Sequence, residues 1–318
     1  MSWTSDAILR VSRGYQASCV LLAGAELGVF GALAKRPLTA RQAAARLGAK
    51  ERGMTVLLDA LAAMRVLRKR RRLYSLSPEA GAGLGMTNML RHQANCLRRW
   101  SHLAKAVKTG KPAPRVPSIL GERGDAASFI GAMDDINRRV ADDLVRSLKL
   151  RPFKTLLDIG GASGTWTAAF LRKYPDAAAV IFDLPHVIPM ARKRRLARVT
   201  LVAGDFLNDP LPRGCDLAWL SAIVHQNSRA QNRVLFRKVR QALDPGGRLL
   251  IRDIVMEESR VAPMAGAFFA VNMLAGTKGG GTYTLRELRE DLRSAGFKAV
   301  RLLRRDPGMH SVVEARTA

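Results

Sequence analysis

Apolar residues recur with two different spacings along the chain. Up to about residue 150 the spacing is mainly helical, as it is over 54–64, where Leu57, Leu58 and Leu61 share one face. From residue 156 onward, short continuous apolar runs predict buried strands at 156–159, 178–182, 199–203, 215–224 and 248–252. Strands separated by helical segments are typical of a parallel sheet covered by helices, so the pattern predicts an α/β domain after a mainly helical one.

The first 80 residues predict a helix-turn-helix followed by a hairpin. Thr39 stands where it can cap a helix over 40–47, Gly48 ends that helix, and 54–64 forms the second helix. Residues 65–67 and 73–76 then pair as strands around the basic run 68–72, which places this run at the tip of a wing. Five consecutive basic residues on a wing keep nucleic-acid binding open as an alternative function.

Residues 81–150 connect the two halves. Pro112, Pro114 and Pro117 predict a loop, and a long helix over 129–148 follows it. Met133 and Asn137 lie one turn apart on this helix. They are candidates for contact with a substrate, with ordinary helix packing as the alternative.

The strand at 156–159 runs into an acidic residue and a glycine turn. Gly160, Gly161 and Gly164 let the backbone approach a ligand beyond the carboxyl ends of the strands. Asp158 would repel a pyrophosphate but would accept a hydrogen bond from an ammonium group, and Ala162 stands where a dinucleotide fingerprint has glycine. The turn therefore favours a nucleoside that carries a cationic amino acid over NAD.

Carboxylates also follow the next two strands. Asp183, with Leu184 beside it, stands where this topology places the acid that holds ribose hydroxyls. The third strand ends in Gly204, Asp205 and Phe206, and we expect Asp205 to accept from an adenine amino group while Phe206 covers the ring. Any one of these aspartates is explained equally well as a helix cap. Three successive acidic strand ends favour a cofactor site.

The net charge of the chain adds anionic macromolecules to the candidate partners. The chain has 53 Lys and Arg against 26 Asp and Glu, a net charge of +27. A field of this sign attracts nucleic acids, polyphosphates and anionic membranes non-specifically. The basic residues are spread from end to end, with dense runs at 68–72 and 192–195, so solvated arginine-rich faces explain them as well as a polyanion or an acidic substrate does.

Cysteine usage and apolar run length restrict the class of protein. Cys19, Cys96 and Cys215 are odd in number and widely spaced, which argues against a disulfide framework or a metal site and favours reduced packing residues. No apolar run approaches the ~20 residues that a membrane span needs, and no signal-peptide pattern begins the sequence. We expect a cytoplasmic protein with no metal and no membrane partner.

Catalytic candidates follow the apolar run 215–224. His225 stands at the carboxyl end of a central strand, and neutral imidazole, with an unperturbed pKa of ~6.5, accepts a proton near neutral pH. It is the candidate general base, with capping or packing as the alternative. Phe269, Asn272 and Met273 precede a glycine turn and suit a planar apolar acceptor, although a core stripe has the same composition.

These motifs resemble those of the S-adenosylmethionine-dependent O-methyltransferases of the plant and bacterial small-molecule type. The resemblance rests on L-L-D-I-G-G-A-S-G at 156–164, F-D-L-P-H-V at 182–187, G-D-F at 204–206 and D-P-G-G at 244–247. Segments such as A-x-A-E-L-G-V-F at 23–30 and L-T-A-x-x-A-A-x-x-L-G at 38–48 extend it over nearly the whole chain.

The resemblance implies a domain organisation and a reaction. It implies a winged-helix dimerisation domain over 1–105, a helical linker over 106–150 that contributes to the substrate pocket, and a Rossmann-like class I methyltransferase domain over 151–318. It also implies a homodimer that uses S-adenosylmethionine, forms S-adenosylhomocysteine, and methylates a hydroxyl of a small, aromatic metabolite.

The catalytic residues of that family carry over unevenly. Asp253 stands where the family often has glutamate and is expected to orient His225, but Gln226 follows the histidine in place of aspartate. Thr282 stands in place of a second acid. These departures leave three alternatives open: a cofactor-binding protein with lost or decarboxylase-like activity, a methyltransferase acting on nitrogen or carbon, and a nucleic-acid binder.

Overall fold

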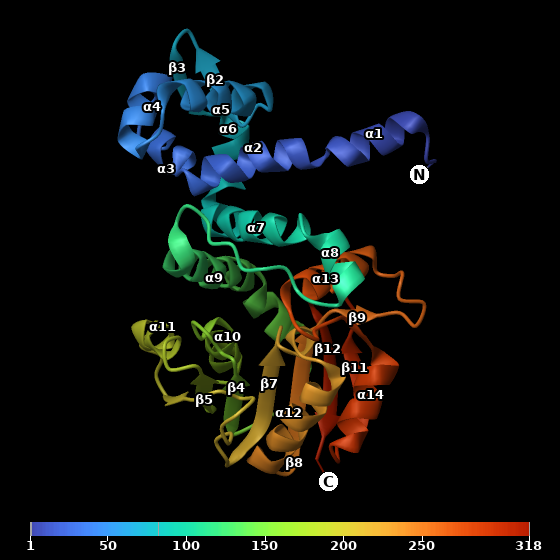
Figure 1. Ribbon diagram of the computed structural model, residues 1–318. Coiled ribbons are helices and arrows are strands. Elements are labelled where there is room, and N and C mark those ends of the chain that lie inside the picture. Colours follow the sequence, from blue (N-terminus) through green and yellow to red (C-terminus); the bar gives the residue numbers. More distant parts are fainter. Residues whose placement is uncertain (1, 82, 318) are drawn as a thin grey trace. The chain divides into compact units, whose positions relative to one another are not determined.

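The computed structural model describes residues 2–81 and 83–317, and the described chain separates into two compact units (Figure 1). The first unit contains the residues up to 98 together with 115–135, and the second contains 99–114 and the residues from 136 onward. The expected linker 106–150 is therefore divided, because 115–135 packs in the first unit and its remaining residues in the second.

The first unit is mainly helical with a small antiparallel sheet. Its helices are α1 (Ser5–Arg13), α2 (Tyr15–Glu26), α3 (Val29–Leu33), α4 (Ala40–Leu47), α5 (Glu51–Ala63), α6 (Pro78–Gly81), the short 3-10 helix η1 (Gly83–Met86), most of α7 (Thr87–Trp100) and the first half of α9 (Gly121–Ser147). Strands β1 (Leu38–Thr39), β2 (Leu67–Arg70) and β3 (Leu73–Leu76) form a sheet in the order β1-β3-β2.

The local sequence explains the helix-turn-helix and the wing. Thr39 accepts from the backbone of Gln42 while the Gln42 side chain accepts from Thr39, a capping box that begins α4, and Gly48 ends the helix at φ 65°. The expected order of two helices and a hairpin is confirmed. The basic run is placed differently, since three of its residues lie within β2 and only Arg71 and Arg72 form the turn.

The second unit is built on a sheet whose described residues form seven strands in the order β11-β12-β8-β7-β4-β5-β6. The strands are β4 (Thr155–Ile159), β5 (Ala178–Asp183), β6 (Val199–Ala203), β7 (Cys215–Ser221), β8 (Leu243–Asp253), β11 (Lys298–Arg304) and β12 (Ser311–Arg316). Strands β4 to β8 run parallel, and β12 pairs antiparallel with β8 and β11. Because the strand order reverses beside β4, ligands are expected at the carboxyl end of that strand.

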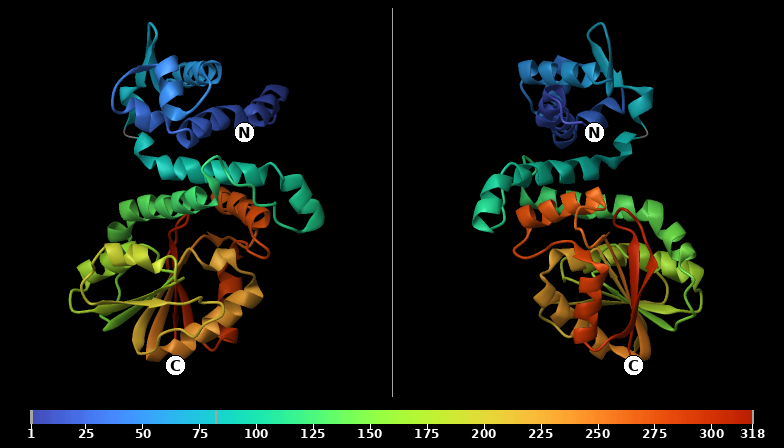
Figure 2. Two further views of the ribbon diagram at one scale, coloured as in Figure 1. Left: turned by 60° about the vertical axis from the view of Figure 1, so that its left-hand side comes forward. Right: turned by 90° about the vertical axis from the view of Figure 1, so that its right-hand side faces the viewer.

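Helices cover both faces of this sheet (Figure 2). Alternate residues along a strand point to opposite faces, and Leu156 packs with α9 and α10 (Thr165–Lys173) whereas Leu157 packs with α12 (Arg229–Ala242) and α14 (Leu285–Ser294). The remaining elements are α8 (Leu103–Thr109), α11 (Ile188–Lys193), the 3-10 helix η2 (Val224–Gln226), α13 (Met264–Gly276) and the parallel pair β9 (Val255–Met256) and β10 (Tyr283–Thr284).

Two expectations about composition can be compared with this fold. Cys96 and Cys215 are buried as expected, but Cys19 is exposed, so the packing role expected for Cys19 is wrong. Burial raises the pKa of the Cys215 thiol to about 11. Across residues 2–81 and 83–317, no helix combines the length and the apolar character needed to cross a membrane.

Candidate functional site

Three strand ends meet at the carboxyl edge of the sheet in the second unit. The backbone N–H of Gly160, after β4, donates to Phe182 O at 2.8 Å, and that of Gly204, after β6, donates to Asp183 O at 2.9 Å. These bonds join the ends of β4, β5 and β6. The structure thus brings together the glycine turn and the two later acidic strand ends predicted to hold a cofactor.

The glycine turn is a shallow cradle formed by backbone. Gly160 and Gly164 adopt left-handed φ values of 69° and 74°, which favour glycine. A Cβ placed on Gly161 would lie 2.9 Å from Asp158 Cγ and 2.9 Å from Ile181 Cγ2. Larger residues at these positions would collide with side chains packed against the turn, so the turn keeps this conformation only with glycine.

Asp158 lies beneath this turn and is almost fully buried, with 1% exposure. Thr167, in the first turn of α10, donates its hydroxyl hydrogen to Asp158 Oδ2 at 2.6 Å. Burial raises the pKa of Asp158 to about 7, the Thr167 hydroxyl opposes the rise, and the charge of Asp183 adds to it. The sequence pattern identified Asp158 but gave no sign of Thr167, whose contact depends on how α10 packs on β4.

Asp183 ties the glycine turn to the end of β5. Its Oδ2 accepts from the Ala162 backbone N–H at 2.8 Å and its Oδ1 from the Leu184 N–H at 2.7 Å. Burial raises the pKa of Asp183, and the two backbone donors partly offset that rise. Each carboxylate oxygen has a second lone pair, so a half-buried Asp183 can also accept from ribose hydroxyls.

The end of β6 forms a tight loop around its own aspartate. Asp205 Oδ1 accepts from the Leu207 N–H at 2.9 Å and Oδ2 from Asn208 Nδ2 at 2.8 Å. A Cβ on Gly204 would approach the Phe182 ring to 2.5 Å, while Phe206 packs partly buried against the core. Contact of Asp205 and Phe206 with adenine stays a prediction.

His225 and Asp253 form a buried pair beyond the ends of β7 and β8. His225 Nδ1 lies 2.9 Å from Asp253 Oδ1 and 3.0 Å from Oδ2, and the two residues are 6% and 3% exposed. The backbone N–H groups of His225 and Ile254 also donate to the carboxylate. Since a carboxylate only accepts, Nδ1 carries the ring hydrogen and Nε2 of the neutral ring keeps its lone pair.

A glycine loop closes over the backbone of the histidine. Gly281 N–H donates to His225 O at 2.9 Å. A Cβ on Gly280 would lie 2.4 Å from His225 O and 2.6 Å from Thr277 Oγ1, so this position admits only glycine without displacement of His225. Thr282 follows the loop, is buried, and donates to Gly266 O at 3.3 Å.

Helix α13 brings two of the predicted substrate residues into defined contacts. The Phe269 ring meets the His225 ring edge-on, with centroids 4.8 Å apart and an interplanar angle of 86°. Asn272 Oδ1 accepts from Trp100 Nε1 at 3.0 Å. Met273 is 7% exposed and lies in the interior. Of the pair predicted on α9, Met133 belongs to the first unit and Asn137 to the second.

Two further side chains contribute to the surroundings of the site. Trp100 fixes the Asn272 amide through a contact set by tertiary structure. Arg194 belongs to the basic run 192–195 but donates from Nη2 to Thr165 Oγ1 at 2.6 Å, beside the glycine turn. Among residues 2–81 and 83–317, no group of three His, Cys, Asp or Glu side chains is arranged to hold a metal ion.

Two family models match the chain. One describes an O-methyltransferase domain and matches residues 100–298, and the other describes an O-methyltransferase dimerisation domain and matches residues 9–82. Between them they span both units.

Individual relatives show the same likeness. Demethylspheroidene O-methyltransferase of Rhodobacter capsulatus is 31% identical, over 98% of this chain and 81% of the relative. The 3-hydroxy-5-methyl-1-naphthoate 3-O-methyltransferase of Streptomyces sahachiroi is 32% identical, over 92% and 90%. The crystal structure of human N-acetylserotonin methyltransferase in complex with S-adenosylmethionine superposes with a TM-score of 0.84 at 25% identity, covering 100% of this chain and 99% of the other.

The buried carboxyl of Asp158 predicts an unusual pH dependence of stability. Its pKa of about 7 in the folded chain lies above the ordinary 3.8, so its contribution to the free energy of unfolding is fully present below pH 3.8 and is lost as the pH rises through 7. Asp158→Asn should remove this loss. Between pH 5 and pH 8 the free energy of unfolding of the variant should therefore rise by about 2–3 kcal/mol relative to that of the wild type. Urea unfolding of the ligand-free protein at both pH values measures the difference. Asp176→Asn, at an exposed site, is the control, and an equal difference at both pH values would contradict the assignment.

Proposed function

The chain belongs to the O-methyltransferase family that these two models describe, and on this premise we propose that His225 is the general base of its reaction. It is an S-adenosylmethionine-dependent O-methyltransferase, and the Streptomyces sahachiroi relative acts on a hydroxynaphthoate, which is an aromatic substrate. We propose a hydroxylated aromatic acceptor here. The observation that carries the proposal is the buried His225–Asp253 pair at the edge of the sheet where the glycine turn lies.

The residues at the three strand ends suit S-adenosylmethionine. The glycine turn at 160–164 lies next to Asp183, which has lone pairs for two ribose hydroxyls. Asp158 and Asp183 give the turn a negative field suited to a cationic ligand. Gly160, Gly161, Gly164 and Leu184 would contact the cofactor through backbone, and Gly204, Asp205 and Phe206 would contact its adenine.

His225 lies close to this cradle through the register of the sheet. Leu220 on β7 pairs with Ile159 on β4, and Ile223 Cδ1 would lie 2.8 Å from a Cβ on Gly160. His225 therefore comes two residues after Ile223, whose side chain borders the glycine turn. Asp253 holds Nδ1 and leaves Nε2 to accept a proton, as a base requires.

The proposed reaction is a direct displacement. S-adenosylmethionine, when bound, supplies an electrophilic methyl group. His225 Nε2 would take the proton of the acceptor hydroxyl, so that the acceptor oxygen could receive the methyl group and S-adenosylhomocysteine would be the leaving product. The carboxylate of Asp253 stabilises the imidazolium that results. Alignment of the reacting atoms contributes most of the acceleration, and the base adds about 10²- to 10⁴-fold.

We place the acceptor beside Phe269 and Asn272. The Phe269 ring meets His225 and offers an apolar contact to a planar ring. An indole N–H only donates, so the Asn272 oxygen faces Trp100 and its Nδ2 hydrogens are directed elsewhere. These hydrogens suit a carbonyl or hydroxyl oxygen of the acceptor. Asn137 and Met273 remain proposed contributors to the pocket, and acceptor contact by Met133 stays a prediction from the sequence.

The altered surroundings of His225 leave the base with a single carboxylate neighbour. Gln226 is exposed and donates to Ala222 O, and Thr282 donates to Gly266 O, so neither replaces an acid beside the imidazole. A His225–Asp253 pair is sufficient for proton removal from a phenol. This pair favours O-methylation over the decarboxylase-like alternative and over methylation of nitrogen or carbon.

The first unit supports a homodimer, and a cytoplasmic location stays a prediction from the sequence. Helix α1 exposes large apolar side chains, with Ile8 52%, Leu9 49% and Val11 58% accessible, within the segment that matches the dimerisation model or next to it. Such a stripe is typical of a surface covered by a partner. In the wing, Arg68 pairs with Glu79 and Lys69 with Asp59, which reduces the charge offered to a polyanion. Non-specific polyanion contact stays a prediction from the net charge.

Removal of the proposed ribose acid should weaken cofactor binding. Asp183→Ala loses charge-assisted hydrogen bonds of roughly 1.5–3 kcal/mol each, so the Kd for S-adenosylhomocysteine should rise about tenfold or more. Calorimetric titration measures this, with thermal unfolding to verify the fold and Asp176→Ala as an exposed control of equal charge change. Unchanged affinity would refute the ribose role.

Removal of the base should affect turnover and spare the cofactor site. His225→Ala should lower kcat by about 10²- to 10⁴-fold for a weakly acidic phenol, with S-adenosylhomocysteine affinity unchanged. Release of S-adenosylhomocysteine with a panel of naphthols measures kcat, and Gln226→Ala, at the exposed neighbour, is the control. Wild-type turnover in His225→Ala would rule out the base.

The glycine loop provides a matched pair of variants. Gly280→Ala places a Cβ 2.4 Å from His225 O and should displace the imidazole, lowering kcat about tenfold or more with cofactor affinity retained. Gly281→Ala meets its nearest neighbour, the Tyr283 hydroxyl, only at 4.0 Å and should leave kcat near the wild-type value. Equal effects of the two substitutions would contradict a positioning role for residue 280.

A further inference from the structure

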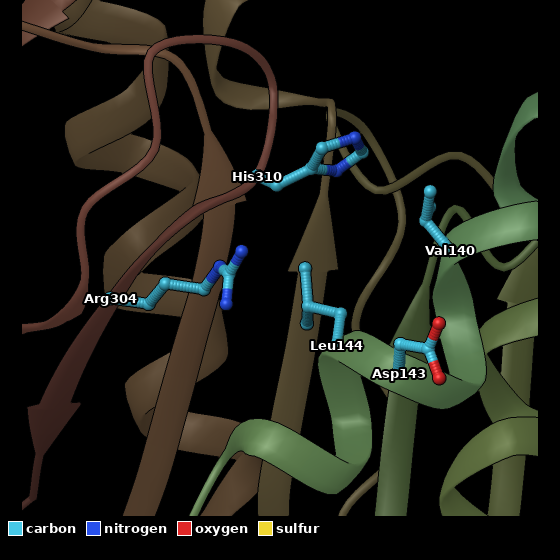
Figure 3. A pocket seen from close by; sticks show the side chains of 5 residues that line it. All are labelled: Val140, Asp143, Leu144, Arg304 and His310. Atoms are coloured by element: carbon cyan, nitrogen blue, oxygen red, sulfur yellow. The ribbon is translucent and has the colours of Figure 1, made fainter.

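A small pocket lies in the second unit on the α9 face of the sheet, and no step of methyl transfer uses it. It has a volume of about 160 Å³ and is lined by Val140, Asp143, Leu144, Arg304 and His310. Since a water molecule occupies about 30 Å³ of liquid, this volume accommodates roughly five waters or one compact organic molecule. Figure 3 shows Arg304 and His310 on one side of it and the three α9 residues on the other.

His310 presents an N–H group to this pocket. Its Nδ1 lies 3.2 Å from Arg252 Nε and 3.1 Å from Arg252 Nη2. A guanidinium only donates, so Nδ1 must accept, and the hydrogen of the neutral ring is on Nε2. Burial, and then the charge of Arg252, lowers the pKa of His310, which keeps this tautomer at neutral pH.

Two guanidinium groups bring hydrogen-bond donors to the pocket. Arg252 is 2% exposed, donates to Ser221 Oγ at 2.8 Å and stacks on the Trp166 ring at 4.6 Å, but within the described part of the chain it forms no direct ion pair. Arg304 lies 3.6 Å from the Asp306 carboxylate, and its Nε is buried without an acceptor among the described residues. The free Nε donor and the buried Arg252 charge favour an acceptor in this pocket.

The opposite wall limits the kind of anion. Val140 and Leu144 on α9 offer apolar surface. Asp143 lines the pocket as well, but its side chain is 80% exposed and pairs with Arg146, which places its charge at the rim and in solvent. An anion with an alkyl group matches these walls better than a fully polar one such as phosphate.

We propose that this pocket binds a small aliphatic monocarboxylate. The carboxylate accepts from Arg304 and from His310 Nε2, with Arg252 behind them, and the alkyl group packs on Val140 and Leu144. The site is distinct from that of methyl transfer, because Arg252 and Asp253 are consecutive on β8 and point to opposite faces of the sheet.

Isobutyrate, with its neutral isostere isobutyramide, provides the test. Saturation-transfer NMR titrations use the full-length protein loaded with S-adenosylhomocysteine, so binding is read without turnover. We expect isobutyrate to bind with a Kd of the order of 1 mM and isobutyramide about tenfold more weakly or not at all. Equal binding of the two compounds, or no binding of isobutyrate, would overturn the proposal.

Three variants locate the bound carboxylate. Arg304→Gln should weaken isobutyrate binding about tenfold, whereas Arg305→Gln, at the exposed neighbour, should change it little. Asp143→Asn removes a negative charge at the rim and should strengthen isobutyrate binding about two- to fivefold. Weaker isobutyrate binding in Asp143→Asn would show that the Asp143 charge does not oppose the ligand, and equal effects at 304 and 305 would indicate non-specific attraction; either result contradicts the site.

Discussion

The hydrogen bond from the Ala162 N–H to the Asp183 carboxylate holds the glycine turn of β4 against the end of β5, and the cofactor half of the site depends on it. The parallel register beneath it, with Ile159 beside Phe182, fixes both strand ends at the same level. Without this tie the left-handed glycines would leave the turn free to adopt other conformations. The same carboxylate that suits ribose hydroxyls therefore also shapes the cradle next to them.

The catalytic half depends on a different constraint, the exclusion of side chains from the loop 279–281. His225 is reached by its carboxylate partner on one side, an aromatic ring on another and a glycine backbone on a third. Each contact removes an alternative orientation of the imidazole. The site lacks the second acid of its family, but His225 still presents one defined lone pair, on Nε2.

Much of this architecture follows from local sequence patterns. Apolar runs that end in Asp158, Asp183 and Asp205 specified the strands of the cofactor edge, because a run of buried residues followed by a turn is a short-range signal. Thr39 marked a helix start for the same reason. The pairing of His225 with Asp253 was expected from the family resemblance, and the structure brings the two side chains together.

Other features depend on packing between distant segments and leave no local signal. Thr167 under Asp158, Trp100 against Asn272 and Arg252 against His310 join residues whose partners are set by tertiary structure. The basic run at 68–72 was misplaced because β2 includes its first three residues, since charge alone does not end a strand whose partner β3 is in register. Arg252 illustrates the difficulty. From sequence alone an arginine on a strand is expected to face solvent, and only the structure shows that it is buried against the Trp166 ring and the Ser221 hydroxyl.

The raised pKa of Asp158 has a consequence for the heat of cofactor binding. A carboxyl group with a pKa of about 7 is half protonated at neutral pH, and a positive charge brought close to it favours the ionised form. Binding of a sulfonium cofactor would then expel part of a proton into the buffer. The apparent binding enthalpy would vary with the ionisation enthalpy of that buffer. Binding of a cationic ligand would thus be coupled to release of a proton to the solvent.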